Sequence, residues 1–358
     1  MHVPFHERPL VARHPAWLGA WLAVGLLFGL GAHAQTPPPH EDATPHRAAQ
    51  SDEPLLDERG DDDRPLAAQV LDAAKRLPSG VQRLTDIRYG ANAANRFDVY
   101  RPANADLAPI ILMVHGGGWR TGSKASSAVV SNKVAHWVTQ GVIVVSADYR
   151  LLPDADPLEQ AQDIAQALAH VQAHASRWGG DPKRVVLMGH SAGAHLVALL
   201  HARPMLAYGV GAKPWLSTIA LDSAALDVPA IMEAPHPRLY DRAFGRDPGF
   251  WQAASPWHQM TKGMPPMLAV CSTLRDTPCP QARRFKEQAR KFGGVVDVLP
   301  VALSHRDINA ALGHNDGAQA AAYTQQVDRH LRRIDPQWPI STAVRRHDNA
   351  CLLYTSPS

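Results

Sequence analysis

Apolar runs alternate with amphipathic stretches along most of this chain. Residues 109–114, 141–147 and 184–188 are almost wholly apolar, as is typical of strands that are covered on both faces. Residues 158–178 instead carry apolar side chains every three or four positions, and Gly179 and Gly180 follow directly. That spacing predicts an amphipathic helix that ends at the two glycines.

The same pattern continues on both sides of this region. Two short alternating runs, 84–89 and 96–100, surround a turn and predict an antiparallel hairpin. Further strands are expected at 216–221, 267–272 and 295–303, and further helices at 282–292 and 317–334. Because strands and helices alternate, the prediction is an α/β fold with a mostly parallel sheet, helices on both faces and an N-terminal antiparallel hairpin.

The two ends of the chain differ from this globular region. Residues 1–34 have basic residues, an uncharged apolar stretch and Ala32-His33-Ala34, the pattern of a signal peptide. An uncleaved membrane anchor is the alternative. Residues 35–65 are rich in proline and acidic residues and predict a disordered linker, so we expect the folded domain at 66–335. Residues 336–358 are expected to be an unstructured tail, of which 351–358 resembles a translated sequencing adapter.

The charge of the chain indicates which kinds of molecule it is expected to bind. The formal net charge of the 358 residues is +3, and lysines and arginines are scattered rather than clustered. This distribution does not suggest a nucleic-acid partner. The signal peptide predicts an exported protein, periplasmic or secreted, without stable membrane insertion after cleavage.

The chemistry centres on Gly189-His190-Ser191-Ala192-Gly193, which lies between a predicted strand and an apolar helical stretch. A G-x-S-x-G sequence in that context forms a nucleophile elbow, a tight turn that presents the serine hydroxyl above the sheet. Ser191 is therefore the candidate nucleophile. An ordinary strand-to-helix turn is the alternative.

An earlier glycine-rich segment, His115-Gly116-Gly117-Gly118-Trp119, follows the strand at 109–114. Consecutive glycines allow backbone N–H groups to converge on the oxygen that becomes negative during acyl transfer. The expected oxyanion-hole donors are Gly117, Gly118 and Ala192. His115 is expected to be structural, and Trp119 could line the substrate pocket or lie in the core.

If Ser191 is the nucleophile, its acidic partner residue is expected in a loop that follows one of the last strands. Asp276 is the only carboxylate between Cys271 and Cys279, and we expect these two cysteines to form a disulfide in an oxidising compartment. Asp276 is therefore the predicted acid. Asp222 and Asp227 are the alternatives, and Asp297, inside a predicted strand, is a weaker one.

The histidine that would act as the general base is expected after the last strand. His305 has that place and is the predicted base, with His314 as its competitor. His170 and His174 have the i, i+4 spacing of metal ligands, but no third ligand motif accompanies them, so no metal site is predicted.

Ser, Asp and His in this order after a glycine-rich loop are typical of the α/β-hydrolase fold. The segments around 114–124, 148–151, 189–195 and 305–313 resemble the esterase/lipase branch of that family, and within it bacterial feruloyl and acetyl-xylan esterase-like enzymes and arylformamidases. The resemblance covers about residues 80–335. It departs from the family at 204–266, the segment expected to face the substrate.

The resemblance implies a serine hydrolase that cleaves a small or aryl or sugar ester through an acyl-enzyme, with Ser191, Asp276 and His305 as its triad and no metal or organic cofactor. Three alternatives stay open: an arylformamidase, a peptidase of the prolyl-oligopeptidase type, which normally carries an additional propeller, and a non-catalytic binding protein on the same fold.

Overall fold

The computed structural model describes residues 77–314 and 316–339. The predicted signal peptide, the linker, residues 66–76 of the predicted domain and residues 340–358 of the predicted tail lie outside these residues. The expectation of an unstructured tail is wrong for 336–339, because Trp338 is 1 % exposed and belongs to the core cluster that includes α11 residues. Within the described part, no helix is long and apolar enough to span a bilayer.

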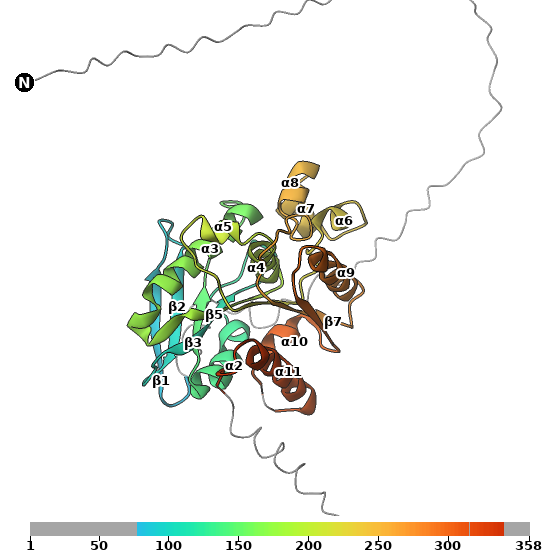
Figure 1. Cartoon of the computed structure of the whole chain (residues 1–358). Helices are drawn as coiled ribbons and strands as arrows, with labels where there is room; N and C mark the ends of the chain where they lie inside the picture. The colour runs from blue at the N-terminus through green and yellow to red at the C-terminus, as the bar shows by residue number, and fades with distance from the viewer. Residues whose placement is uncertain (1–76, 315, 340–358) are drawn as a thin grey trace, which may run out of the picture. The chain divides into compact units, whose positions relative to one another are not determined.

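The described residues contain one eight-stranded sheet (Figure 1). Its strands are β1 (Val81–Arg88), β2 (Arg96–Pro102), β3 (Ala108–Val114), β4 (Ile143–Ala147), β5 (Gly180–His190), β6 (Ser217–Leu221), β7 (Met267–Ser272) and β8 (Val296–Val301). Their order across the sheet is β1-β2-β4-β3-β5-β6-β7-β8. β1 and β2 pair antiparallel, β2 also pairs antiparallel with β4, and the remaining pairs are parallel. The predicted fold class, including the N-terminal hairpin, is confirmed.

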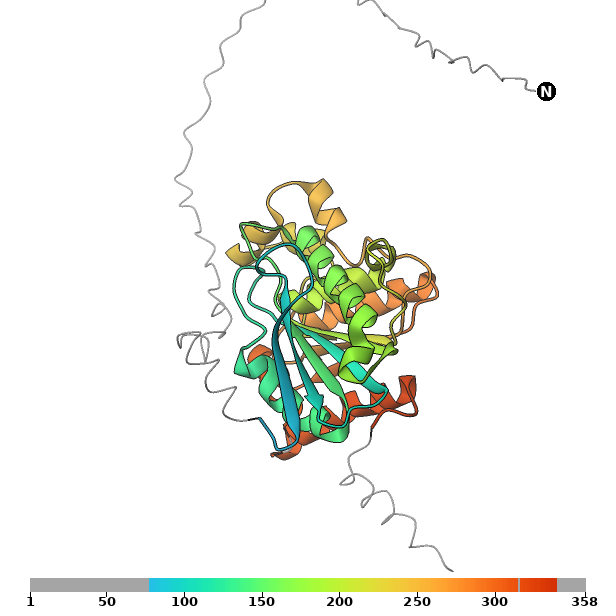
Figure 2. The ribbon, with the colours of Figure 1, turned by 90° about the vertical axis from the view of Figure 1, so that its left-hand side faces the viewer.

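Helices cover both faces of the sheet (Figures 1 and 2). They are α2 (Ser127–Trp137), α3 (Pro157–His174), α4 (Ala192–Ala202), α5 (Met205–Tyr208), α6 (Val228–Met232), α7 (Arg238–Phe244), α8 (Pro248–Ala253), α9 (Pro278–Lys291), α10 (His305–Ala310) and α11 (Ala318–Ile334), with short 3-10 helices at Val138–Gln140 and Ala175–Trp178. α3, α4 and α9 lie on one face, and α2, α10 and α11 lie on the other.

The apolar strands explain this three-layer arrangement. Along β3, Ile110 and Leu112 belong to the core beneath α3 and α4, whereas Ile111 and Met113 belong to the core on the α2 and α11 side. Successive side chains of a strand point to opposite faces, so a strand that is covered on both sides must be apolar throughout. The continuous apolar runs in the sequence are a direct consequence.

Local signals explain where α3 begins. The side chain of Asp156 accepts hydrogen bonds from the N–H groups of Leu158 and Glu159, and the Glu159 carboxylate accepts one from the Asp156 N–H. This reciprocal capping box and Pro157 at the first helical position favour a start at this point. The structure shortens the expected helix, because the last turn, Ala175–Trp178, is a 3-10 helix.

Outside the irregular segment 204–266, two helices were not expected from the sequence. The buried face of α2 includes the polar residues Lys133 and His136, which interrupt its apolar period, and α10 is too short for its period to be recognised. α10 nevertheless begins with His305, so it carries one of the predicted site residues. The irregular segment 204–266 contains the short helices α5 to α8.

A histidine on α4 is buried without hydrogen bonds to its ring nitrogens from the described residues. His201 is fully buried and packs on Phe285 of α9, with ring centroids 6.0 Å apart. Among the described residues, neither ring nitrogen has a hydrogen-bond partner. Burial lowers the pKa of His201 to about 3, so the ring is neutral in the folded protein at ordinary pH.

We therefore predict that His201→Leu raises the stability of the protein. The substitution removes two buried polar atoms and should raise Tm by about 3 °C at pH 7.5. An unfolded histidine takes up a proton below about pH 6.5, whereas the folded one does not until about pH 3. The wild type therefore loses stability as the pH falls through this window, and the difference in Tm between variant and wild type should be larger at pH 5 than at pH 7.5. A variant with a lower Tm at both pH values would contradict this account.

Candidate active site

Ser191 lies in a strained turn between β5 and α4. Its φ and ψ angles are 53° and −118°, a conformation that costs a non-glycine residue energy and is typical of functional sites. Flanking glycines make the turn possible, since a Cβ on Gly189 would lie 2.4 Å from the carbonyl oxygen of Gly193. The N–H of Ser191 donates to the carbonyl of Leu221 at the end of β6, over 3.0 Å. The turn is thus the elbow that the sequence predicts.

His305 connects Ser191 to a carboxylate. Its Nε2 lies 2.9 Å from Ser191 Oγ, and its Nδ1 donates to Asp222 Oδ2 over 2.7 Å. His305 is 9 % exposed and the side chain of Asp222 is fully buried, so both hydrogen bonds are largely shielded from solvent. In this arrangement Nε2 can accept the serine proton while Nδ1 keeps its own proton.

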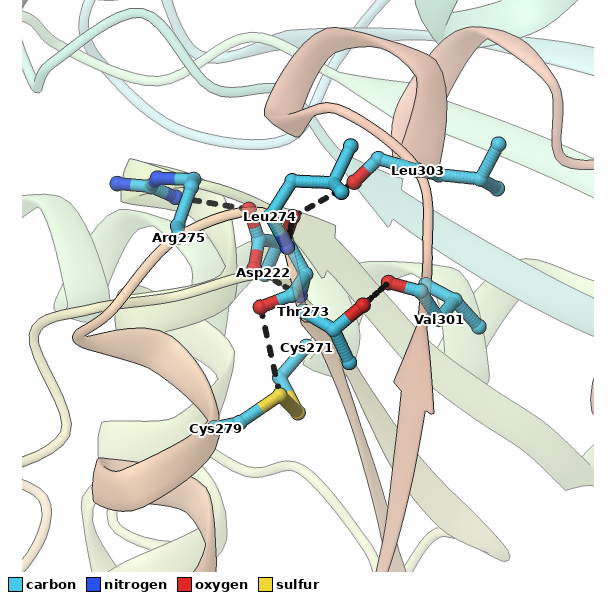
Figure 3. The surroundings of a disulfide bond; sticks show 9 residues. Asp222, Cys271, Thr273, Leu274, Arg275, Cys279, Val301 and Leu303 are labelled. Atoms are coloured by element: carbon cyan, nitrogen blue, oxygen red, sulfur yellow. Dashed lines mark hydrogen bonds and ion pairs between the residues drawn. A yellow bond between two sulfur atoms is a disulfide. The ribbon is translucent and has the colours of Figure 1, made fainter.

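The environment of Asp222 keeps this carboxylate ionised. Burial alone would raise its pKa, but the hydrogen bond from His305, the charges of His305 and Arg275 and the hydrogen bond from the Ser272 N–H lower the pKa of Asp222 to about 2. Ser272 N–H donates to Oδ1 over 2.7 Å, and Arg275 Nη1 donates to Oδ2, also over 2.7 Å. Figure 3 shows Arg275 directed at the carboxylate.

The prediction that Asp276 faces His305 is wrong in this structure. Asp276 is an exposed residue of the turn just before α9, beyond the loop that follows β7. β6 lies directly between β5 and β7, so the residue that follows β6 lies beside the elbow. Asp222 has that place, and its backbone N–H donates to Val270 of β7, which fixes it between the two neighbouring strands.

The remaining alternatives have other partners. Asp227 caps α6 by accepting from the Ala230 N–H, and Asp297 pairs with Arg333. His314 contacts the backbone of Asp316 through Nδ1. His170 and His174 stack on each other with centroids 4.0 Å apart, and no group of three or more potential metal-ligating side chains gathers anywhere in residues 77–314 and 316–339.

The glycine-rich loop lies against the elbow. A Cβ on Gly193 would be 2.4 Å from the carbonyl oxygens of Val114 and His115, and a Cβ on Gly116 would be 2.9 Å from Cβ of Ser191. Such close approach of two backbones requires glycine at both places. His115 is structural: its ring stacks on Tyr149, whose hydroxyl donates to the His115 carbonyl over 3.0 Å.

A cavity of about 410 Å³ opens over Ser191. Gly118 and Ala192 line it, whereas Gly117 lines a smaller neighbouring cavity. Gly118 and Ala192 therefore have the place of two of the three predicted oxyanion donors. The role of Gly117 stays a prediction, and its φ of 111° shows why this position in the loop favours glycine.

Aromatic side chains build one wall of this cavity. Trp119 is buried and lines the cavity, with its ring centroid 5.9 Å from Tyr240 and 5.0 Å from Phe244, both on α7. Its indole N–H donates to His195 Nδ1 over 3.2 Å, and His195 Nε2 donates to the carbonyl of Ala254. Trp119 thus joins the glycine-rich loop to α4 and to the segment 204–266.

Comparisons with known proteins agree with this geometry. A family model described as BD-FAE matches residues 97–204, and the carboxylesterase family model matches residues 160–256. Over these residues the chain is similar to the esterase/lipase branch of the α/β-hydrolases. Both matches include the elbow.

Individual relatives are similar over part of their length. The isoprenylcysteine alpha-carbonyl methylesterase ICME of Arabidopsis thaliana is 39 % identical over 31 % of this chain and 26 % of its own length. Esterase LipC of Mycobacterium tuberculosis is 30 % identical over 57 % of this chain and 54 % of its own. The chain thus spans about a quarter of the length of the first of these curated relatives and about half of the second.

Solved structures share the fold. Esterase B of Lactobacillus rhamnosus aligns with a TM-score of 0.60 at 22 % identity, over 76 % of this chain and 92 % of its own. Esterase 2 of Thermogutta terrifontis aligns with a TM-score of 0.59 at 24 % identity, over 75 % of this chain and 98 % of its own.

The two candidate aspartates form a matched pair for mutagenesis. Asp222→Asn should lower kcat on an activated ester about 10³- to 10⁴-fold, because an amide cannot stabilise the productive tautomer and the imidazolium. Asp276→Asn should retain at least about half of the wild-type rate. Steady-state kinetics of both purified variants, with circular dichroism to compare their folds, would check this. The opposite ranking would restore Asp276 as the acid.

Cys271 and Cys279 are joined in a disulfide in the structure, with an S–S distance of 2.07 Å. The chain has three cysteines. Protein produced in an oxidising compartment should therefore show one thiol when it is denatured without reductant, and three after reduction. Three thiols before reduction would contradict the bridge.

Proposed function

We propose that this protein is a serine carboxylic-ester hydrolase. The observation that carries the proposal is the continuous hydrogen-bonded series from Ser191 through His305 to Asp222, at the floor of an open cavity. A serine in a strained elbow, a histidine in hydrogen-bond reach and a buried carboxylate behind it are the parts that acyl transfer through an acyl-enzyme requires.

The reaction has two halves. His305 Nε2 takes the hydroxyl proton of Ser191 as Oγ attacks the ester carbonyl, and a tetrahedral intermediate forms. His305 then gives this proton to the leaving alcohol, and the acyl group stays on Ser191. A water molecule, deprotonated by the same nitrogen, releases the acid and restores the serine. Asp222 holds the imidazole in the tautomer whose Nε2 carries no proton, and it balances the positive charge of the imidazolium.

The negative oxygen of the intermediate needs N–H donors that are already in place. Ala192 is the first residue of α4, so its N–H has no partner within the helix and lies at the positive end of the helix dipole. The N–H of Gly118, which also lines the cavity, is the second donor in this proposal. Each well-placed donor contributes about 3 kcal/mol to transition-state stabilisation.

The cavity supports a small or aryl or sugar ester as the substrate class. Its volume of about 410 Å³ accommodates a molecule of modest size, and Trp119, Leu239 and Tyr240 give it an apolar and aromatic wall. The relatives are named for acting on esters, which is consistent with a small-molecule ester substrate.

We also propose that the protein is exported. The signal-like pattern of residues 1–34 and the disulfide between Cys271 and Cys279 support an oxidising compartment. Cytosolic thiols are normally kept reduced, so a structural disulfide favours the periplasm or the exterior.

The direct kinetic test is Ser191→Ala. Hydrolysis of 4-nitrophenyl acetate and butyrate should fall at least about 10⁴-fold, because the nucleophile is removed while the cavity remains. Tm should stay within a few degrees of the wild-type value, since alanine keeps the Cβ and the backbone conformation of the turn and removes only the hydroxyl oxygen.

Ser223→Ala is the matched control, because Ser223 lines the same cavity but belongs to neither the elbow nor its hydrogen-bonded series. It should keep most of the ester hydrolysis. A folded Ser191→Ala protein with wild-type turnover would exclude the proposed mechanism. Turnover of N-formylkynurenine with no turnover of either ester would favour an arylformamidase instead.

A further inference from the structure

The loop between β7 and α9 brings a cation to the buried acid. Arg275 Nη1 lies 2.7 Å from Asp222 Oδ2, the same oxygen that accepts the hydrogen bond from His305. The same Nη1 lies 2.9 Å from His305 Nδ1. The permanent positive charge of Arg275 therefore lies within hydrogen-bond distance of both the Asp222 carboxylate and the His305 imidazole.

Loop contacts hold Arg275 in this place, as Figure 3 shows. Ser272 Oγ donates to the carbonyl of Leu303 over 2.6 Å and accepts from the Leu274 N–H. Thr273 N–H donates to the carbonyl of Val301 over 2.8 Å. The Cys271–Cys279 disulfide closes the loop at its base. Arg275 is thus presented by an anchored loop, and its side chain is 23 % exposed.

The charge of Arg275 acts on His305 in the opposite direction to that of Asp222. An anion beside an imidazole favours its protonation, and a cation disfavours it. Asp222 must stay ionised to orient the imidazole, but alone it would also favour a protonated His305 that cannot accept the serine proton. A guanidinium on the same carboxylate oxygen offsets part of this effect, and it also strengthens the ionised form of Asp222.

We propose that Arg275 is a positioning residue of the site: it holds Asp222 and lowers the proton affinity of His305, so that His305 remains a competent base at more acidic pH. This inference rests on the proposed esterase function. It assigns Arg275 no contact with the reacting atoms.

Other charged and titratable groups surround His305 from each neighbouring element. His190, on the elbow, donates from Nε2 to the His305 carbonyl over 2.9 Å, and burial, followed by the nearby His305, holds the pKa of His190 well below its usual range, so it stays neutral. Lys133 of α2 donates to Asn309 on α10. Arg306 is exposed, and Asp307 accepts a hydrogen bond from Ser304.

The test is the pH dependence of kcat/KM for a neutral ester between pH 4.5 and 9. In Arg275→Gln, which keeps hydrogen-bond donors but loses the charge, the acid limb should move up by about 0.5 to 1 pH unit. In Arg275→Lys, which keeps the charge, it should stay within about 0.3 unit of the wild type. Arg275→Met serves as a second neutral variant if the glutamine variant does not fold.

Arg306→Gln is the control for a general loss of positive charge, because Arg306 also lines the cavity but is exposed. Its acid limb should move less than that of Arg275→Gln. An unchanged limb in both neutral variants of Arg275, or an equal shift in Arg306→Gln, would overturn the proposal.

A readout without turnover separates this inference from the proposed function. The NMR titration of the His305 ring protons, assigned by their loss in His305→Gln, should show a higher midpoint in Arg275→Gln than in the wild type. If the wild type hydrolyses no ester but this midpoint shifts, the proposed function fails and the effect of Arg275 on His305 stands. If esters are hydrolysed and the midpoint does not shift, the proposed function stands and the effect of Arg275 on His305 fails.

Discussion

The hydrogen bond between the buried carboxylate of Asp222 and the imidazole of His305 is the constraint on which the rest of the site depends. It joins the end of β6 to the start of α10 and sets which nitrogen of His305 faces Ser191. A buried charge is tolerated only when it is paired and hydrogen-bonded. Ser272, Arg275 and His305 satisfy Asp222 together, so the loop after β7 and the loop after β8 both take their positions from one carboxylate.

Backbone packing places the other half of the site. The close contacts of Gly193 with the carbonyls of Val114 and His115, and of Gly116 with Ser191, bring the glycine-rich loop within reach of the nucleophile. Trp119 then connects that loop to His195 and to α7. The cavity wall, the predicted oxyanion donors and the nucleophile therefore belong to one packed unit rather than to independent loops.

Local patterns predicted the parts of this architecture that local chemistry determines. The apolar runs identified the buried strands, and the G-x-S-x-G sequence identified the elbow, because a tight turn between two backbones demands glycines in the sequence itself. His305 could be placed after the last strand by order alone. Helix α10 could not, since six residues are too few to show a helical period.

The sequence alone could not identify Asp222 as the acid, for a different reason. Both Asp222 and Asp276 follow buried strands, and only the lateral order of the strands and the path of each loop decide which one meets His305. The loop after β7 turns into α9 with Asp276 outside, and it presents Arg275 to the site instead. A carboxylate directly after β6, the neighbour of the elbow strand, was the signal that favoured Asp222.

Mass spectrometry after treatment with a fluorophosphonate identifies the nucleophile of this protein and measures how reactive it is. We expect one covalent adduct per molecule, located on the peptide that contains Ser191, formed rapidly by the wild type and much more slowly by Asp222→Asn. An adduct on another residue, or labelling of Asp222→Asn at the wild-type rate, would contradict it.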